Sequence, residues 1–147
     1  MIFRGLYDQT VEFKVTNYQY PEIKTGDWDG NWLLIYLKVK SELGNWQTVD
    51  PSLTTWEIKR LAKWFKDLSL NQKIEMNPIE FTEPNLCFEK LREDQNTKII
   101  RIRFDLESRP QSAEENKEYF VDFEYTCNEL NEVAIELQKE LDTFPER

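Results

Sequence analysis

The chain has 147 residues, a net charge of −9 and a pI of about 4.7, and its size predicts one domain over residues 1–147. Five Trp, nine Phe and six Tyr provide the volume for one hydrophobic core, although 32% of the residues are charged. The absence of histidine excludes Ser/His and Cys/His nucleophile pairs and the commonest metal ligand.

The charge and the terminal sequence bear on location and partners. No apolar run approaches the roughly 18 residues that a membrane-spanning helix needs. Residues 1–5 lack the basic and apolar regions of a signal peptide, so we expect a cytoplasmic protein without membrane contact. Lysines and arginines are scattered among acids, which disfavours direct binding to nucleic acid and favours a basic protein partner.

The first third of the chain is predicted to form strands. Residues 11–15 alternate between apolar and polar side chains, as in a half-buried strand, and the alternation slips at a predicted bulge near residues 16–17. Residues 32–39 are at first apolar on both parities, as in a central strand that is covered on both faces. A turn at residues 43–45 then returns the chain as a second hairpin arm over residues 46–49.

A first amphipathic helix is expected from about Thr55 to Ser69. Its start is predicted over residues 50–57, where Thr54 and Glu57 have the spacing of a capping box. The predicted apolar face of this helix consists of Trp56, Leu61, Trp64, Phe65 and Leu68.

Three further strands are expected after the helix. Residues 86–90 form the first, and residues 100–106 and 119–125 alternate apolar side chains with mostly charged ones. If the last two strands pair, Arg101 and Arg103 can meet the acids of the neighbouring strand on the solvent-facing side. The predicted apolar faces of these two strands are Ile100, Ile102, Phe104 and Leu106, and Tyr119, Val121, Phe123 and Tyr125.

A terminal helix completes the pattern. Thr126 and Glu129 repeat the capping-box spacing, and an apolar stripe continues to about Asp142. Together these elements predict an α+β fold, with an antiparallel sheet of about five to six strands and two amphipathic helices packed on one face.

No motif marks a catalytic, metal or cofactor site. Neither glycine-rich phosphate-binding pattern occurs, and Cys87 and Cys127 lie too far apart in sequence to indicate a zinc site strongly. We expect both cysteines to be free thiols in a reducing compartment. We therefore expect a protein that is not an enzyme and uses no catalytic residue, metal or cofactor. A hydrolase with paired carboxylates stays an alternative, because the chain has 28 acids.

The first candidate partner-binding segment precedes the expected central strand. Asp27, Trp28, Asp29 and Asn31 place aromatic and polar groups together, as binding hot spots do. The same residues could instead form a turn that caps backbone groups and closes one end of the core.

The second candidate is the terminal helix. Glu129, Glu132, Glu136 and Glu140 run beside its apolar stripe. They would present an acidic strip to a basic partner, or they are simply a solvated helix face.

Several short motifs resemble the WapI family of bacterial immunity proteins. They are Asp29-x-Asn31-Trp32-Leu33, Gly44-x-Trp46, Asp50-Pro51-Ser52-Leu53-x-Thr55-Trp56-Glu57, Glu83-Pro84-Asn85-Leu86 and Phe144-Pro145-x-Arg147. The resemblance implies a cytosolic antidote that binds the toxic C-terminal domain of a wall-associated polymorphic toxin, in several cases a nuclease. The implied partner is a cognate basic toxin domain.

A second hypothesis is a structural or adaptor domain that binds another protein or itself as a homodimer. Trp32, Leu34 and Tyr36 lie on the second face of the expected central strand. The N-terminal segment, a loop or a partner subunit would have to cover them.

Overall fold

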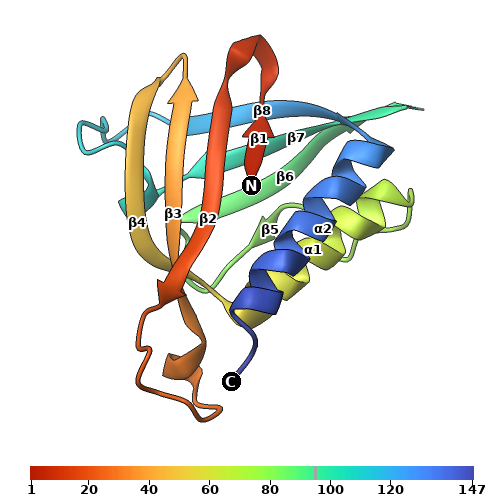
Figure 1. Cartoon of the computed structure of the whole chain (residues 1–147). Helices are drawn as coiled ribbons and strands as arrows, with labels where there is room; N and C mark the ends of the chain where they lie inside the picture. The colour runs from red at the N-terminus through yellow and green to blue at the C-terminus, as the bar shows by residue number, and fades with distance from the viewer. Residues whose placement is uncertain (95) are drawn as a thin grey trace.

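The computed structural model describes residues 1–94 and 96–147, and it has an α+β fold with two antiparallel sheets and two helices (Figure 1). Each sheet has four strands, in the orders β1-β2-β3-β4 and β5-β6-β7-β8. The predicted fold class is confirmed, but the strands form two sheets instead of one. The strands are Ile2–Arg4, Thr10–Tyr18, Trp32–Ser41, Gly44–Thr54, Ile79–Glu80, Leu86–Glu93, Thr97–Phe104 and Tyr119–Thr126.

The two sheets meet where the edge strands β1 and β8 approach each other. The backbone N–H of Arg4 donates to the hydroxyl of Tyr125 at 3.1 Å, which joins the strands without a ladder of backbone bonds. Gly5 follows β1, and a Cβ there would lie 2.8 Å from the Val121 side chain. Glycine therefore permits the close approach. The strands of the two sheets run in clearly different directions (Figure 1).

The first sheet follows the predicted hairpins. The register of β2 against β3 shifts between Val15 and Asn17, which confirms the bulge. Strands β3 and β4 pair around the turn at Gly44, whose φ of +130° suits a residue without a side chain. The outer face of β3 is less covered than predicted, since Leu34 and Tyr36 are only half-buried.

Helix α1 starts and ends where the sequence predicts, at Thr55–Ser69, and the capping box of Thr54 and Glu57 is present. The residues before it were interpreted wrongly as helix-start residues. Residues 50–54 belong to β4, and the register shift between Leu33 and Leu34 leaves Ser52 as the extra residue of a bulge. Pro51 is tolerated there because β4 is an edge strand.

The core is built around Phe3. Its ring centroid lies 6.1 Å from Phe65 of α1, and 6.2 and 5.5 Å from Phe88 and Phe123 of the second sheet. All four rings are at most 1% exposed. Burial of aromatic area at this one point joins both sheets to the helical layer.

Two predicted core residues lie elsewhere. Trp56 is half-exposed, and the buried side of α1 instead includes Ile58 and Ala62. Leu106 ends outside β7, in a short 3₁₀ helix with a φ of 45°, and it is 48% exposed. Trp56 lies in the predicted helix but points away from the face of Leu61, whereas Leu106 lies beyond the end of its predicted strand.

The predicted pairing of β7 with β8 is confirmed. Arg101 lies opposite Asp122 and binds it through two hydrogen bonds, of 2.8 and 2.9 Å. Arg103 does not meet an acid of β8, because the register places it opposite Phe120, and it donates instead to the Cys87 sulfur at 3.1 Å.

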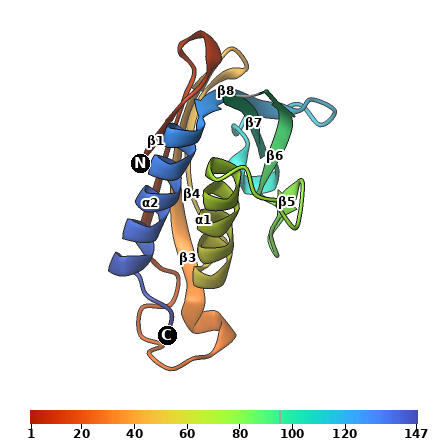
Figure 2. The same cartoon turned by 90° about the vertical axis from the view of Figure 1, so that its right-hand side faces the viewer.

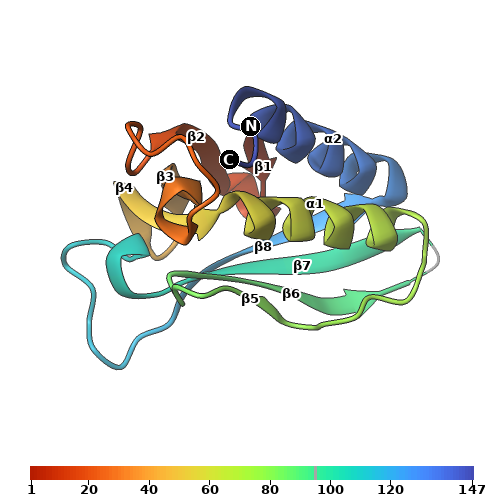
Figure 3. The ribbon, with the colours of Figure 1, turned by 90° about the horizontal axis from the view of Figure 1, so that it is seen from below.

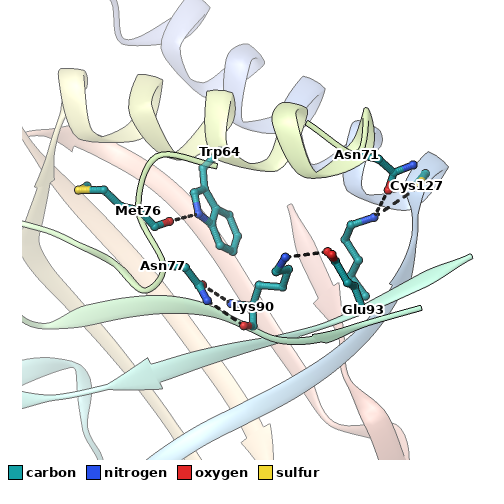
Figure 4. A network of polar contacts seen from close by, with 8 residues as sticks. Trp64, Asn71, Met76, Asn77, Lys90, Glu93 and Cys127 are labelled. Atoms are coloured by element: carbon teal, nitrogen blue, oxygen red, sulfur yellow. Dashed lines mark hydrogen bonds and ion pairs between the residues drawn. The ribbon is translucent and has the colours of Figure 1, made fainter. Parts of the chain in front are cut away.

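Helix α2, Cys127–Thr143, lies beside α1 and covers the same side of the sheets (Figures 2 and 3). Its capping box of Thr126 and Glu129 is present. The end of α1 meets the start of α2 at Asn71, where the buried Lys98 donates to the Asn71 amide oxygen and the Cys127 sulfur (Figure 4). Both cysteines are free thiols, as predicted.

The loop after α1 is tied to the structure by further polar contacts (Figure 4). The Trp64 indole N–H donates to the carbonyl of Met76 at 2.8 Å. The Asn77 side chain exchanges two hydrogen bonds with the backbone of Lys90, of 2.7 and 3.0 Å. These contacts hold residues 70–79 against both α1 and β6.

The two capping boxes should differ in their contribution to stability. Glu57 is 7% exposed, and its second oxygen also accepts hydrogen bonds from the backbone and hydroxyl of Thr82, at 2.7 and 2.8 Å. Glu129 is exposed and caps only its own helix. We expect Glu57→Ala to lower the free energy of unfolding by about 2–4 kcal/mol and Glu129→Ala by about 1 kcal/mol. Urea denaturation measures both, and equal losses would contradict this view.

Candidate partner-binding surfaces

Asn31 ends the 3₁₀ helix η2, Trp28–Asn31, which lies between β2 and β3 at the bottom of Figure 1. Its side chain is fully buried and accepts hydrogen bonds from the Thr55 hydroxyl at 2.9 Å and the Arg147 N–H at 3.0 Å. Its amide group donates to the carbonyls of Asp27 and Arg147. Asn31 therefore connects η2, the start of α1 and the C-terminal segment. This agrees with the alternative interpretation of the segment as a turn that caps backbone groups and closes one end of the core.

Arg147 completes this connection. Its guanidinium donates to the Ile23 carbonyl at 2.6 Å and lies 3.3 Å from the ring centroid of Tyr18. The Tyr18 hydroxyl donates to the Pro145 carbonyl. The loop over residues 19–27 is thereby held against the end of the chain.

The exposed part of this region contains two tryptophans. Trp28 is 55% exposed, and its ring lies 5.0 Å from that of Trp56, centroid to centroid. Asp27 and Asp29 are exposed beside Trp28. An aromatic pair next to carboxylates on a supported loop has the composition of a binding hot spot.

Two acids of the predicted strip on α2 have structural contacts. Glu129 accepts hydrogen bonds from the backbone and hydroxyl of Thr126, at 2.8 and 2.7 Å. Glu140 accepts from the backbone N–H of Val15 at 3.2 Å, and its side chain is 18% exposed. These two carboxylates fix the start of α2 and the packing of the helix against β2.

The other two acids face solvent more freely. Glu132 is exposed, and Glu136 is half-buried and paired with Lys139, whose hydrogen bond lowers the pKa of the Glu136 carboxyl. Both line a hollow of about 490 Å³ between α2 and the ends of β1 and β8. Glu124 and the 53% exposed side chain of Ile2 also line it. The hollow thus combines apolar surface with several carboxylates and one cation, the exposed Arg4.

The two candidate surfaces lie at different places on the molecule. The η2 segment lies near the start of α1 and the end of α2, whereas the acidic hollow lies beside β1 and the first half of α2 (Figure 1). The structure does not bring Trp28 and Glu132 into one surface. A single partner would have to be large to contact both.

Trp56, predicted as a core residue, and Glu124 and Ile2, for which no role is predicted, all contribute to these surfaces. The exposure of Trp56 could have been predicted from the sequence. Trp56 precedes Leu61 by five positions, and a helix turns about 100° per residue, which places the two side chains on nearly opposite sides of α1. Ile2 and Glu124 come together only because β1 and β8 meet, and no local signal indicates that.

The Cys87 thiol is not activated as a nucleophile. Burial raises the pKa of the Cys87 thiol, although Arg103 opposes the shift, and the thiolate is the nucleophilic form. Within residues 1–94 and 96–147, no three Cys, Asp or Glu side chains form a group that could hold a metal ion. No described helix combines the length and the apolar character required to cross a membrane.

Replacing Asn31 should loosen the end of the chain. We expect Asn31→Ala to lower the free energy of unfolding by about 1–3 kcal/mol, because it leaves buried polar groups of Thr55 and Arg147 unpaired. Hydrogen exchange should accelerate at residues 19–31 and 144–147. Asn128→Ala, at an exposed position of α2, is the matched control. Unchanged exchange at the C-terminal segment would contradict the role given to Asn31.

A family model described as "Immunity protein WapI-like family" matches residues 1–145 of the chain. No curated protein and no solved structure matches the chain.

Proposed function

The chain belongs to the WapI-like immunity protein family, and we propose that it binds and neutralises the toxic C-terminal domain of a polymorphic toxin. The family match over residues 1–145 is the observation that carries this proposal. The membership favours a role without catalysis, exerted by stoichiometric binding in the cytoplasm. The toxic domain is proposed to be a nuclease, whose substrate groove would be basic.

The acidic hollow on α2 is the proposed first contact with the toxin. Glu132, Glu136 and Glu124 line it, and exposed Ile2 adds apolar area. A net charge of −9 attracts a basic domain over a distance, and clustered carboxylates direct it to one face. Glu129 and Glu140 bind backbone groups of the fold, whereas Glu132 is exposed and Glu136 pairs with the exposed Lys139. Glu132 and Glu136 are therefore the residues proposed to act on the partner.

The tryptophan pair is proposed as a second contact. Trp28 and Trp56 can bury aromatic area against a partner, and Asp27 and Asp29 lie at the edge of the pair. Asn31 supports this contact from below without touching the partner, since it is fully buried. Charged contacts mainly set the association rate, and buried aromatic contacts mainly set the dissociation rate.

Co-expression tests the function itself. The chain is expected to restore growth to cells that express the C-terminal toxic domain of the polymorphic toxin from the same genome, because a stoichiometric complex would block the toxin. An unrelated toxin domain is the control and should remain toxic. If the folded chain is expressed but growth is not restored, the proposal fails.

Charge reversal tests the acidic hollow. We expect Glu132→Lys/Glu136→Lys to slow association with the toxin domain about tenfold at low salt and to flatten its salt dependence. The control, Glu42→Lys/Glu115→Lys, makes the same change in net charge at exposed residues outside both surfaces. Stopped-flow association rates at several salt concentrations distinguish the variants. Equal slowing by both would mean that net charge, and not this hollow, governs capture.

A further inference from the structure

The outer side of the helical layer is uncovered and has an apolar centre. Helices α1 and α2 run antiparallel, side by side, and no other helix or strand of residues 1–94 and 96–147 lies on their outer side (Figures 2 and 3). Along the seam between them lies a hollow of about 470 Å³, whose floor includes Ala62, Ala134 and Ile135. Ile135 is 47% exposed, although it is a large apolar residue. The two alanines leave room for another helix to approach closely.

Opposite charges flank this seam. Lys59, Lys63 and Lys66 line it from α1, and the helix carries four basic and two acidic residues, of which Glu57 is buried. Helix α2 carries five acidic residues and one lysine. Glu132 is exposed and Glu136 half-buried, and both lie on the side of α2 toward β1, next to the residues that line the seam. No acid lies between Lys59 and Lys66 in the sequence, and the helical repeat places these three lysines on one side of α1. The α1 half of the helical surface therefore carries a net positive charge and the α2 half a net negative one. Within these halves Lys63 pairs with Asp67, Lys66 donates to Asn131, and Glu136 pairs with Lys139.

We propose that this surface binds a second copy of the chain, in a symmetric dimer whose two-fold axis runs along the seam, parallel to the helices. A rotation about that axis lays each α1 on the α2 of the other copy. Lys63 and Lys66 of one copy would then lie opposite Glu132 and Glu136 of the other. Ile135 and the alanines of both copies would form the apolar centre, with the charged side chains as a polar rim.

The charge pattern selects this arrangement over others. An axis across the helices, in the same plane, would lay α1 on α1 and bring lysines against lysines. Like charges placed together in an interface oppose association. A partner that is acidic throughout would fit the α1 half and be repelled by the α2 half. A surface whose two halves complement each other is matched by its own copy.

Sedimentation velocity and light scattering of the chain alone test this proposal. The wild type should associate to a dimer as its concentration rises. Lys63→Glu/Lys66→Glu and Glu132→Lys/Glu136→Lys should each raise the dissociation constant by about tenfold or more. An equimolar mixture of the two variants should form a heterodimer, because each of its two helix contacts again pairs opposite charges.

Control variants exclude general effects of charge. Lys14→Glu/Lys38→Glu makes the same change in net charge as Lys63→Glu/Lys66→Glu, but on exposed residues of β2 and β3, outside the helical layer. It should leave dimerisation unchanged. Circular dichroism checks that every variant is folded. A wild type that stays monomeric at all concentrations overturns the proposal, and so does a mixture of folded variants that fails to associate. Because no toxin is present, the result does not depend on the proposed function.

Discussion

The contact of Phe3 with Phe65, Phe88 and Phe123 is the constraint on which the rest of the structure depends. Phe3 lies in a strand of only three residues, yet it reaches α1 and two strands of the other sheet. Among the described residues the two sheets share no ladder of backbone bonds, so the buried aromatic area at this junction holds them together. Their mutual placement in turn defines the side that α1 and α2 cover, and hence which helical faces reach solvent.

The charges of the helices follow from that placement. With their apolar stripes turned to the core, α1 exposes Lys59, Lys63 and Lys66, and α2 exposes Glu132. The proposed toxin contact and the proposed dimer both use Glu132 and Glu136. If both proposals hold, the two partners compete for the same carboxylates, and the free dimer would dissociate as the toxin binds. A partner with higher charge density would have the advantage in that competition.

Local chemistry explains why the helix starts could be predicted and why some residues could not. Thr54 with Glu57, and Thr126 with Glu129, satisfy backbone donors within four residues, so each signal is complete in the sequence. Asn31 is different, because its partners Thr55 and Arg147 lie 24 and 116 positions away. Its spacing to neighbouring aromatics suggested a binding residue, whereas its burial gives it a structural role. Trp56 was misplaced because an aromatic residue was counted on the apolar face without respect to the helical repeat.

The sequence by itself determined the longer elements, but not the short strands β1 and β5: alternation marked the longer strands, capping boxes marked both helices, and short motifs indicated the immunity family. These signals are local, since side-chain direction and backbone capping depend on neighbours a few residues away. Only the tertiary structure decided the division into two sheets, the burial of Asn31, and the two surfaces that contain Glu132. Each of these depends on contacts such as Arg4 with Tyr125, which are distant in sequence and arise only when the core closes.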